Sequence, residues 1–282
     1  MAKISFIKVE SLGNDFVIVD QSGGARRWTP RQAAAVCDRR LGVGADGLIL
    51  LGPATNEGIR FRLFNADGSQ AEWSGNGVRG VGAYLAAMNP RQHEFHLETI
   101  AGCIRVCAAK RKGGGVLASF SRPMPPVEVV SSRAARAVTG MAGRHLVAGP
   151  VYVDAGNPHW VFVVATLEFD WEAMGRECQL LNRRTGGINV EFAHVPSRRR
   201  MKLCIFERGV GATPSSGSGA LAAASACRVM DLVEKSLSVS SPGGSQSVKF
   251  SSSGESVTLE APSRIVMAGV WSNKDVAKAG RR

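Results

Sequence analysis

The sequence repeats itself at an offset of about half its length, and this duplication limits the fold more than any other feature. Short matches that recur in the same order with nearly equal offsets indicate repeated structural units. The chain of 282 residues is therefore predicted to form two homologous halves, each long enough to bury a core. The matched tracts are 13–19 with 156–163, 39–42 with 183–186, and 74–77 with 216–219, at offsets of 143, 144 and 142.

Each half shows the same order of expected elements: a β-branched strand, a helix, a further strand, and a second helix that begins at a Gly-rich turn. The second helix of each half is so rich in Ala, Gly and Val that it is predicted to be buried all round. The fold class that follows is α/β, with two pseudo-symmetric lobes, each a mixed sheet wrapped around a central helix. The expected elements are strands 16–20 and 160–165, helices 30–40 and 172–182, strands 60–65 and 201–207, and helices 77–88 and 219–230.

The domain boundaries follow from this duplication. The N-terminal lobe is expected to span 1–114 and to be completed by 265–275, and the C-terminal lobe to span 115–264. Residues 276–282 are polar and basic, and such a terminus is expected to fray.

Composition narrows the class of protein. An apolar content of 44% and a charged content of 21% are those of a globular protein. No apolar run approaches the ~18 residues of a membrane span, and the N-terminus lacks the apolar core of a signal peptide. We therefore expect a cytoplasmic protein with no membrane partner.

The net charge of +12 could indicate nucleic-acid binding. The basic clusters are dispersed, however, and are not interleaved with aromatic residues, so we expect solvated surface and no nucleic-acid partner. The six cysteines contain no CxxC pair and are expected to be reduced, mostly buried thiols.

Two serines, Ser74 and Ser216, lie at the predicted N-terminus of the buried helix of each half, a position that favours ligand binding and catalysis. Each opens a Gly-x-Gly turn that leads into the buried helix. The unpaired N–H groups and the positive dipole end of a helix N-terminus bind carboxylates and lower the pKa of a nucleophile. Either serine taken alone is more simply an N-cap. The duplication, however, would direct both toward the seam between the lobes, and clefts between domains are preferred ligand sites.

Further polar residues recur at matched positions in the two halves. Asn65 and Glu207 each lie nine residues before the serine of their half, at a strand end. An isolated Asn in a turn is usually turn chemistry. The matched set nevertheless predicts a site that holds a small zwitterion; its other members are Asn14, Asn157, Asn189, His159 and Arg208.

These motifs resemble those of diaminopimelate epimerases, in family order from residue 12 to residue 219. The family has two pseudo-symmetric α/β lobes, which agrees with the duplication. The motifs are Leu12-Gly13-Asn14-Asp15-Phe16, Gly42-Val43-Gly44-Ala45-Asp46-Gly47, Phe64-Asn65-Ala66-Asp67-Gly68-Ser69, Gly75-Asn76-Gly77-Val78-Arg79, Gly156-Asn157-Pro158-His159, Asn189-Val190-Glu191-Phe192 and Glu207-Arg208-Gly209-Val210-Gly211.

The resemblance implies interconversion of LL- and meso-diaminopimelate, on the route to lysine and cell-wall precursors, without cofactor or metal. In the family one cysteine thiolate removes the α-proton and a second cysteine returns one from the opposite face. It further implies that His159 and Glu207 tune this acid/base pair, and it suggests a homodimer. Substrate binding would fall to Asn14, Asn65, Asn157, Asn189, Glu207 and Arg208, with backbone donors from Gly75, Asn76, Gly217 and Ser218.

The chain departs from the family at the reacting positions, because Ser74 and Ser216 stand where the two cysteines belong. Trp73 is bulkier than the usual neighbour of the first cysteine, and Glu10-Ser11 replaces a common His-Gly. A helix dipole contributes only ~0.3–2 kcal/mol, or about one pKa unit, which does not make serine a base equivalent to a thiol. Cys227 lies eleven residues past Ser216, about 16 Å along a helix, and is too far away to substitute.

Three interpretations remain open at this stage. The first is an isomerase of this family acting on diaminopimelate or a related amino acid. The second is another α-proton reaction in the same pocket, an isomerisation or a dehydration, with His159 or Glu207 as base. The third is a paralogue that binds a small amino acid without turnover.

Overall fold

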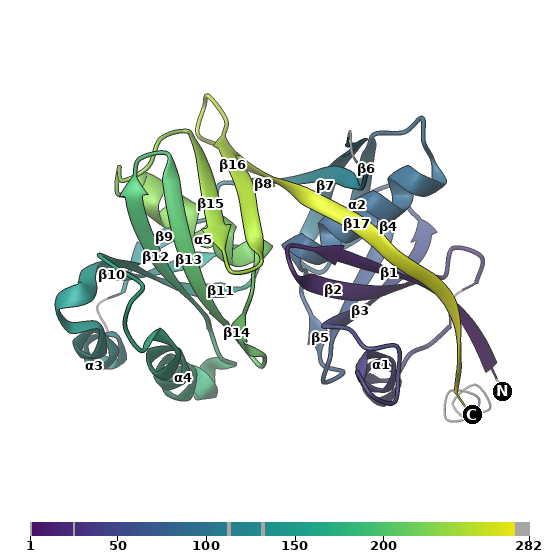
Figure 1. Ribbon diagram of the computed structural model, residues 1–282, viewed down its shortest axis with the longest axis horizontal. Helices are drawn as coiled ribbons and strands as arrows, with labels where there is room; N and C mark the ends of the chain where they lie inside the picture. Colours follow the sequence, from purple (N-terminus) through teal and green to yellow (C-terminus); the bar gives the residue numbers. More distant parts are fainter. Residues whose placement is uncertain (1, 25, 112–113, 131–132, 274–282) are drawn as a thin grey trace. The chain divides into compact units, whose positions relative to one another are not determined.

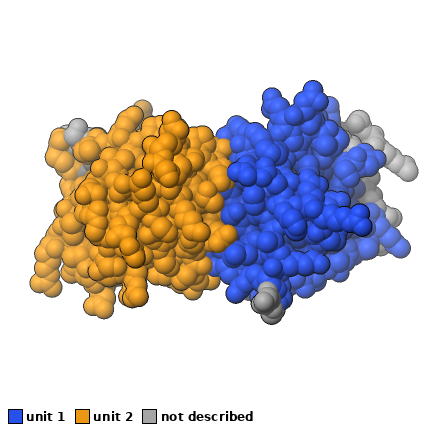
Figure 2. All heavy atoms as spheres, turned by 90° about the horizontal axis from the view of Figure 1, so that it is seen from above, with its two compact units in different colours: residues 1–120, 261–282 blue, residues 121–260 orange. Residues whose placement is uncertain are grey.

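The chain divides into two compact units, and each is formed around one buried helix. The computed structural model describes residues 2–24, 26–111, 114–130 and 133–273. Unit 1 comprises residues 1–120 and 261–282, and unit 2 comprises residues 121–260 (Figure 2). The chain passes between them within β8 (Val116–Pro123) and β17 (Ser256–Asn273). The predicted tail at 276–282 lies outside the described residues, as do residues 274 and 275 of the segment expected to complete the first lobe.

Unit 1 contains a mixed sheet with two parallel crossovers. Strands β2 and β3 pair in parallel through α1, and β4 and β6 pair in parallel through α2, while the other neighbours are antiparallel. The elements are β1 (Ala2–Ser11), β2 (Asn14–Asp20), α1 (Pro30–Cys37), β3 (Gly47–Ala54), β4 (Ile59–Asn65), β5 (Gln70–Ala71), α2 (Gly75–Met88), β6 (Glu94–Thr99) and β7 (Gly102–Lys110), with β17 paired to β1 (Figure 1).

Unit 2 repeats this order and adds, at its start, a short strand and a helix that have no counterpart in unit 1. Strands β11 and β12 pair in parallel through α4, and β13 and β15 pair in parallel through α5. The elements are β9 (Val127–Val129), α3 (Arg133–Ala142), β10 (Leu146–Asp154), β11 (Pro158–Val164), α4 (Trp171–Asn182), β12 (Asn189–Ser197), β13 (Arg200–Glu207), β14 (Gly211–Thr213), α5 (Gly217–Val229), β15 (Ser236–Ser241) and β16 (Gly244–Phe250). The predicted duplication, the fold class and the existence of the eight expected elements are thus confirmed. Their ends differ: α1 stops at Cys37, three residues early, and α2 and α5 begin two residues earlier than predicted, because each Gly-x-Gly segment forms the first helical turn.

The central helices are buried along most of their length, as their composition predicts. Every residue from Gly75 to Ala86 in α2, and from Gly217 to Cys227 in α5, is buried. Glycine allows α2 to approach its sheet closely. A Cβ added at Gly80 would lie 2.5 Å from a methyl of Val9.

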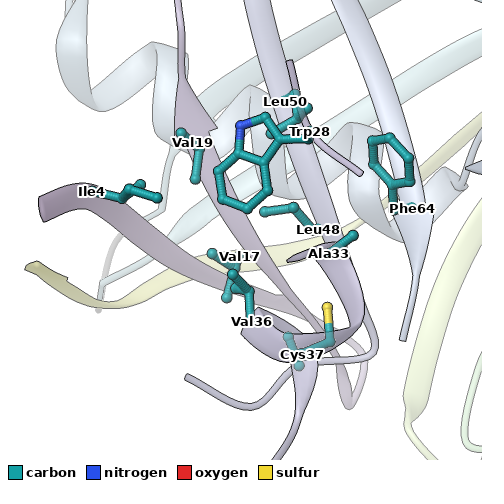
Figure 3. Close-up of a cluster of buried hydrophobic side chains, with 11 residues drawn as sticks. Ile4, Val17, Val19, Trp28, Ala33, Val36, Cys37, Leu48, Leu50 and Phe64 are labelled. Carbon is teal, nitrogen blue, oxygen red and sulfur yellow. The ribbon is translucent and has the colours of Figure 1, made fainter. Parts of the chain in front are cut away.

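The opposite face of each sheet is covered by a second helical layer. In unit 1, alternate side chains of β2 and β3 pack against α1, as Figure 3 shows for Val17, Val19 and Leu48. Helix α1 begins at the capping box of Thr29 and Gln32, with Pro30 at its first position. In unit 2, α3 and α4 cover the corresponding face. Successive side chains of a strand point to opposite faces of the sheet. The side chains that alternate with these core residues therefore face the central helix, where the candidate site lies.

No helix in the described part of the chain is both long enough and apolar enough to cross a membrane.

Candidate active site

The two serines cap the two central helices with the same geometry. Ser74 has φ −140° and ψ 127°, and Ser216 has φ −140° and ψ 131°. Each Oγ accepts a hydrogen bond from the backbone N–H three residues later, at 3.2 Å in unit 1 and 3.1 Å in unit 2. The N-cap interpretation of both serines is therefore confirmed. The first N–H groups of an α-helix lie outside its own hydrogen-bond ladder, and a helix N-terminus is therefore suited to a carboxylate.

The residues after each serine begin the helices and are buried. In unit 1, Asn76 is 1% exposed, and its side-chain amide donates to Asn14 Oδ1 at 3.4 Å. Asn76 Oδ1 accepts from the guanidinium of Arg79, which is wholly buried and stacks over Phe120. Burial lowers the pKa of Arg79 to about 9. In unit 2, Ser218 Oγ lies 3.3 Å from Ser216 Oγ.

Asn14 is held by a network of charged residues that the sequence did not assign. Its amide donates to Asp46 Oδ2 at 2.6 Å, and Arg39 bridges Asp46 and Asp15. Lys8 completes the network at 2.8 Å from Asp15. Burial by itself would raise the pKa of Asp15, but the hydrogen bonds and charges of Arg39 and Lys8 outweigh it and lower that pKa. The Gly-Asn turn of unit 1 is thus fixed by ion pairs.

The corresponding turn of unit 2 is fixed by a buried histidine. His159 is wholly buried, with Nε2 2.9 Å from Asn157 Oδ1 and Nδ1 2.8 Å from Glu191 Oε1. Both neighbours are oxygen acceptors. Two arrangements satisfy both contacts. In one, a charged imidazolium donates to Asn157 and to the Glu191 carboxylate; in the other, a neutral imidazole donates to Asn157 and accepts from a protonated Glu191.

Glu191 lies against the first turn of α5, the helix that Ser216 caps. A Cβ added at Gly219 would lie 2.6 Å from Glu191 Oε1, so a side chain there would displace this carboxylate. Glu191 is wholly buried, and its Oε2 has no hydrogen-bond partner among the described residues. The positive end of the helix dipole stabilises a carboxylate in this position.

Unit 1 fills the same place with apolar side chains. Phe16 and Ile49 stand where the repeat aligns His159 and Glu191, and both approach the first turn of α2 at Gly77. Within the described residues, an ionisable pair therefore lies beside the helix of Ser216 and none occupies the matching place beside Ser74.

The remaining predicted residues occupy the strand ends. Asn189 donates to Pro158 O at 3.0 Å and accepts from the backbone N–H of Arg208 at 3.0 Å, so it links two of the predicted motifs. Arg208 lines a surface cavity of ≈ 580 Å³ in unit 2. Glu207 is half-buried at the end of β13, and Asn65 donates to Ser69 Oγ at 3.0 Å at the end of β4.

The structure therefore groups the predicted residues within each unit. Asn14 joins Asn76 in unit 1; in unit 2, Asn157 joins His159, and Asn189 joins Arg208. Asn65 bonds within its own turn, to Ser69. Convergence of the residues of the two units on one pocket stays a prediction.

Two departures from the family pattern have structural roles. The indole of Trp73 is 3% exposed and packs edge-on against Phe120, so the core of unit 1 accommodates its bulk. Glu10 accepts from Gly13 N–H at 2.7 Å and from Arg264 at 3.0 Å, and thereby supports the Gly-Asn turn.

Cys227 is wholly buried, and burial raises its pKa to about 12, so it remains a thiol.

Glu191 is the most important residue to which the sequence analysis gave no role. Its signal in the sequence was a carboxylate between the apolar residues Val190 and Phe192, since a buried acidic side chain is rarely found without a partner. That partner, His159, comes from a strand 32 residues earlier, and no local pattern predicts the contact. Across the described ranges, no group of three or more His, Cys, Asp or Glu side chains is arranged to hold a metal ion.

Comparison with known proteins agrees with this architecture. A family model described as diaminopimelate epimerase matches residues 6–117 and 151–266. A diaminopimelate epimerase of Carboxydothermus hydrogenoformans is 34% identical over 280 residues, covering 95% of this chain and 99% of the relative. A diaminopimelate epimerase of a Cyanothece species is 33% identical over 282 residues, with coverage of 95% and 99%.

Solved structures share the fold at much lower identity. A phenazine biosynthesis protein of the PhzF family from Bacillus anthracis has a TM-score of 0.71 at 16% identity, covering 96% of this chain and 99% of that one. A hydroxyproline epimerase from Agrobacterium vitis, with bound trans-4-hydroxy-L-proline, has a TM-score of 0.70 at 14% identity, with coverage of 95% and 92%.

Proposed function

This chain belongs to the diaminopimelate epimerase family, and on that premise we propose that it is a cofactor-independent amino-acid isomerase of this type with slow proton transfer. Its expected ligands are LL- and meso-diaminopimelate. The observation that carries the proposal is the matched pair of serine-capped helix N-termini, Ser74 on α2 and Ser216 on α5. A cytoplasmic location and a homodimer belong to the same proposal.

The helix termini support binding of the reacting carboxylate. The first-turn N–H groups at Gly75-Asn76 and at Gly217-Ser218 point toward the start of each helix, and a carboxylate that accepts from them is stabilised by the dipole. The polar residues of each unit would hold the ammonium and the distal groups. This part of the site does not depend on whether the capping residue is serine or cysteine.

Proton transfer, in contrast, depends on whether the capping residue is serine or cysteine. A hydroxyl is a far weaker acid than a thiol, and the dipole changes a pKa by only about one unit. Each Oγ also accepts the N–H of its own cap, at 3.2 Å and 3.1 Å. We therefore expect exchange of the α-proton to be much slower than in a relative with two cysteines.

The test is exchange of the α-proton of diaminopimelate in D₂O, followed by NMR. The native protein should exchange it slowly, and the double variant Ser74→Cys and Ser216→Cys should exchange it at least ~100-fold faster, the lower range of general acid–base contributions. Each single variant should restore much less epimerisation, because inversion needs an acid and a base on opposite faces. Ser253→Cys, at an exposed loop, is the matched control for an added thiol. Fast epimerisation by the native protein would refute the proposal of slow transfer at serine.

A second candidate function is another α-proton reaction in which a carboxylate of unit 2 acts as the base. It is favoured by an asymmetry between the strand ends, since β13 of unit 2 ends in the carboxylate of Glu207 where the matching β4 of unit 1 ends in the neutral Asn65. His159 is a poor base because it is wholly buried and both ring nitrogens have partners. The half-buried Glu207 is the better base, so Glu207→Gln should abolish any exchange that persists in a Ser74→Ala, Ser216→Ala variant.

Binding without turnover is the third candidate, and it is favoured by the capping role that both hydroxyls already have. Calorimetry with diaminopimelate, lysine, glutamate and proline separates it from the others. Binding without exchange in the native and double-cysteine proteins would support it. No binding at millimolar concentration would exclude all three functions.

A further inference from the structure

The six cysteines differ sharply in environment. Cys37, Cys178 and Cys227 are buried, and burial raises the pKa of each to about 12. Cys107 and Cys204 are half-buried, and desolvation also raises their pKa. The expectation of mostly buried thiols is thus correct for three of the six. Cys103 is the exposed one.

Cys103 stands at one end of a chain of polar side chains on the β6–β7 hairpin of unit 1 (Figure 1). Its Sγ lies 3.8 Å from His96 Nδ1, and His96 Nε2 lies 3.4 Å from Glu94 Oε1. Glu94 Oε2 accepts from Arg105 at 2.6 Å. The order Arg105–Glu94–His96–Cys103 is that of an anchored carboxylate, an oriented imidazole and a thiol.

Each link in this chain favours the next. The hydrogen bond from Arg105 lowers the pKa of Glu94, so its carboxylate is ionised at neutral pH. An ionised Glu94 favours the His96 tautomer that carries its proton on Nε2, and this leaves the Nδ1 lone pair directed at the thiol. His96 is then placed to accept the proton of Cys103.

Other groups also face this thiol. The Glu57 carbonyl oxygen lies 3.2 Å from Sγ and competes with His96 for the thiol proton. Glu98 is the register partner of Cys103, but its carboxylate is engaged by Thr55 at 2.9 Å and lies 3.8 Å from Arg60.

We propose that Cys103 is a modification site, the thiol through which this chain reacts with low-molecular-weight disulfides, with His96 as proton acceptor and Glu94 as a positioning residue. The Cys103 proton passes to Nδ1 as Sγ attacks one sulfur of the disulfide. The S–S bond of the reagent breaks while a new S–S bond forms to Cys103. The departing thiolate takes up the proton, so one disulfide and one thiol are consumed and one of each is produced.

This site is independent of the proposed isomerase function. Its members lie on β6 and β7, and none of them is a predicted substrate-binding or acid/base residue. Failure of α-proton exchange therefore says nothing about the thiol, and the thiol assay needs no amino-acid ligand.

The experiment measures the rate at which the folded, full-length protein forms mixed disulfides. Oxidised glutathione and the uncharged hydroxyethyl disulfide serve as probes, and peptide mapping identifies the modified cysteine. Cys103 should be modified first with both, and Cys103→Ser should remove the fast phase. His96→Gln should slow modification at pH 7 by ~10-fold, because the local base is lost. Glu94→Gln should slow it less.

Cys107→Ser is the matched control, since Cys107 lies on the same strand and also contacts Glu94, at 3.9 Å. It should leave the fast phase unchanged. Prior modification of Cys107 or a buried cysteine in the native protein would overturn the proposal. An unchanged rate in His96→Gln, with the same thermal unfolding as native, would overturn it equally.

Discussion

The buried pair of His159 and Glu191 offers a sharp test because the chain contains its own apolar control. Unit 1 has Phe16 and Ile49 at the matching places, against the same turn of the corresponding helix. The informative variants are therefore His159→Phe, Glu191→Ile and the double change, which converts the polar pair of unit 2 into the apolar pair of unit 1.

The structure sets the expected magnitudes. At 2.8 Å and an effective dielectric constant of ~20, the attraction between the two charges is ~6 kcal/mol. Desolvation of two wholly buried groups costs several kcal/mol per ion, so the net contribution of the pair is small. Each single variant leaves one buried partner uncompensated and should lower the free energy of unfolding by ~3–5 kcal/mol. The double variant should differ from native by less than ~2 kcal/mol, since well-packed apolar pairs often replace buried ion pairs at no loss.

The assay is urea unfolding of all four proteins at pH 7, analysed as a double-mutant cycle. Glu191→Gln is the conservative control and should lose little, because its amide N–H donates to Nδ1 of a neutral His159. A loss below ~1 kcal/mol in Glu191→Ile would refute the account of the pair as mutually required. So would a double variant as unstable as the worse single variant.

Three further outcomes are expected. Gly80→Ala should destabilise the protein by ~1–3 kcal/mol in thermal unfolding, despite the better helix propensity of alanine, because the new methyl has no room. Gly140→Ala is the control: no atom lies within 4 Å of its added Cβ, so it should be neutral or stabilising in the same assay. Asp15 has a lowered pKa when folded, so its contribution is full above its unfolded pKa of ~3.9 and is lost as pH falls toward the folded value. Asp15→Asn should therefore be less stable than native at pH 7 and approach it below pH 4, as measured by unfolding across that range; a difference independent of pH would contradict this. A crystal structure with diaminopimelate should place one amino-acid carbon between Ser74 and Ser216, and a bound ligand remote from either serine would refute the shared pocket.

The sequence by itself was sufficient for the repeated part of the architecture, but not for β9 and α3. The duplication predicted two repeated α/β units. The Gly-x-Gly turns predicted the start of each central helix to within two residues, because capping is a local interaction among residues three apart. The small side chains of those helices predicted their burial for an equally local reason, since a helix without a polar face has no surface to present to water. The positions of Ser74 and Ser216 at the helix starts followed from the same short-range rules.

The environment of each serine was decided only by the tertiary structure. His159 and Glu191 meet across two parallel strands connected by α4, and whether such a strand position faces the central helix or the outer layer depends on register. Trp73 drew attention as a bulky neighbour of the site, yet its ring packs in the core against Phe120, a residue far along the chain. Contacts of this kind form only when the sheet brings distant segments together. The repeat aligns His159 with Phe16 and Glu191 with Ile49, but no motif or spacing could show that these side chains meet beside the first turn of each central helix.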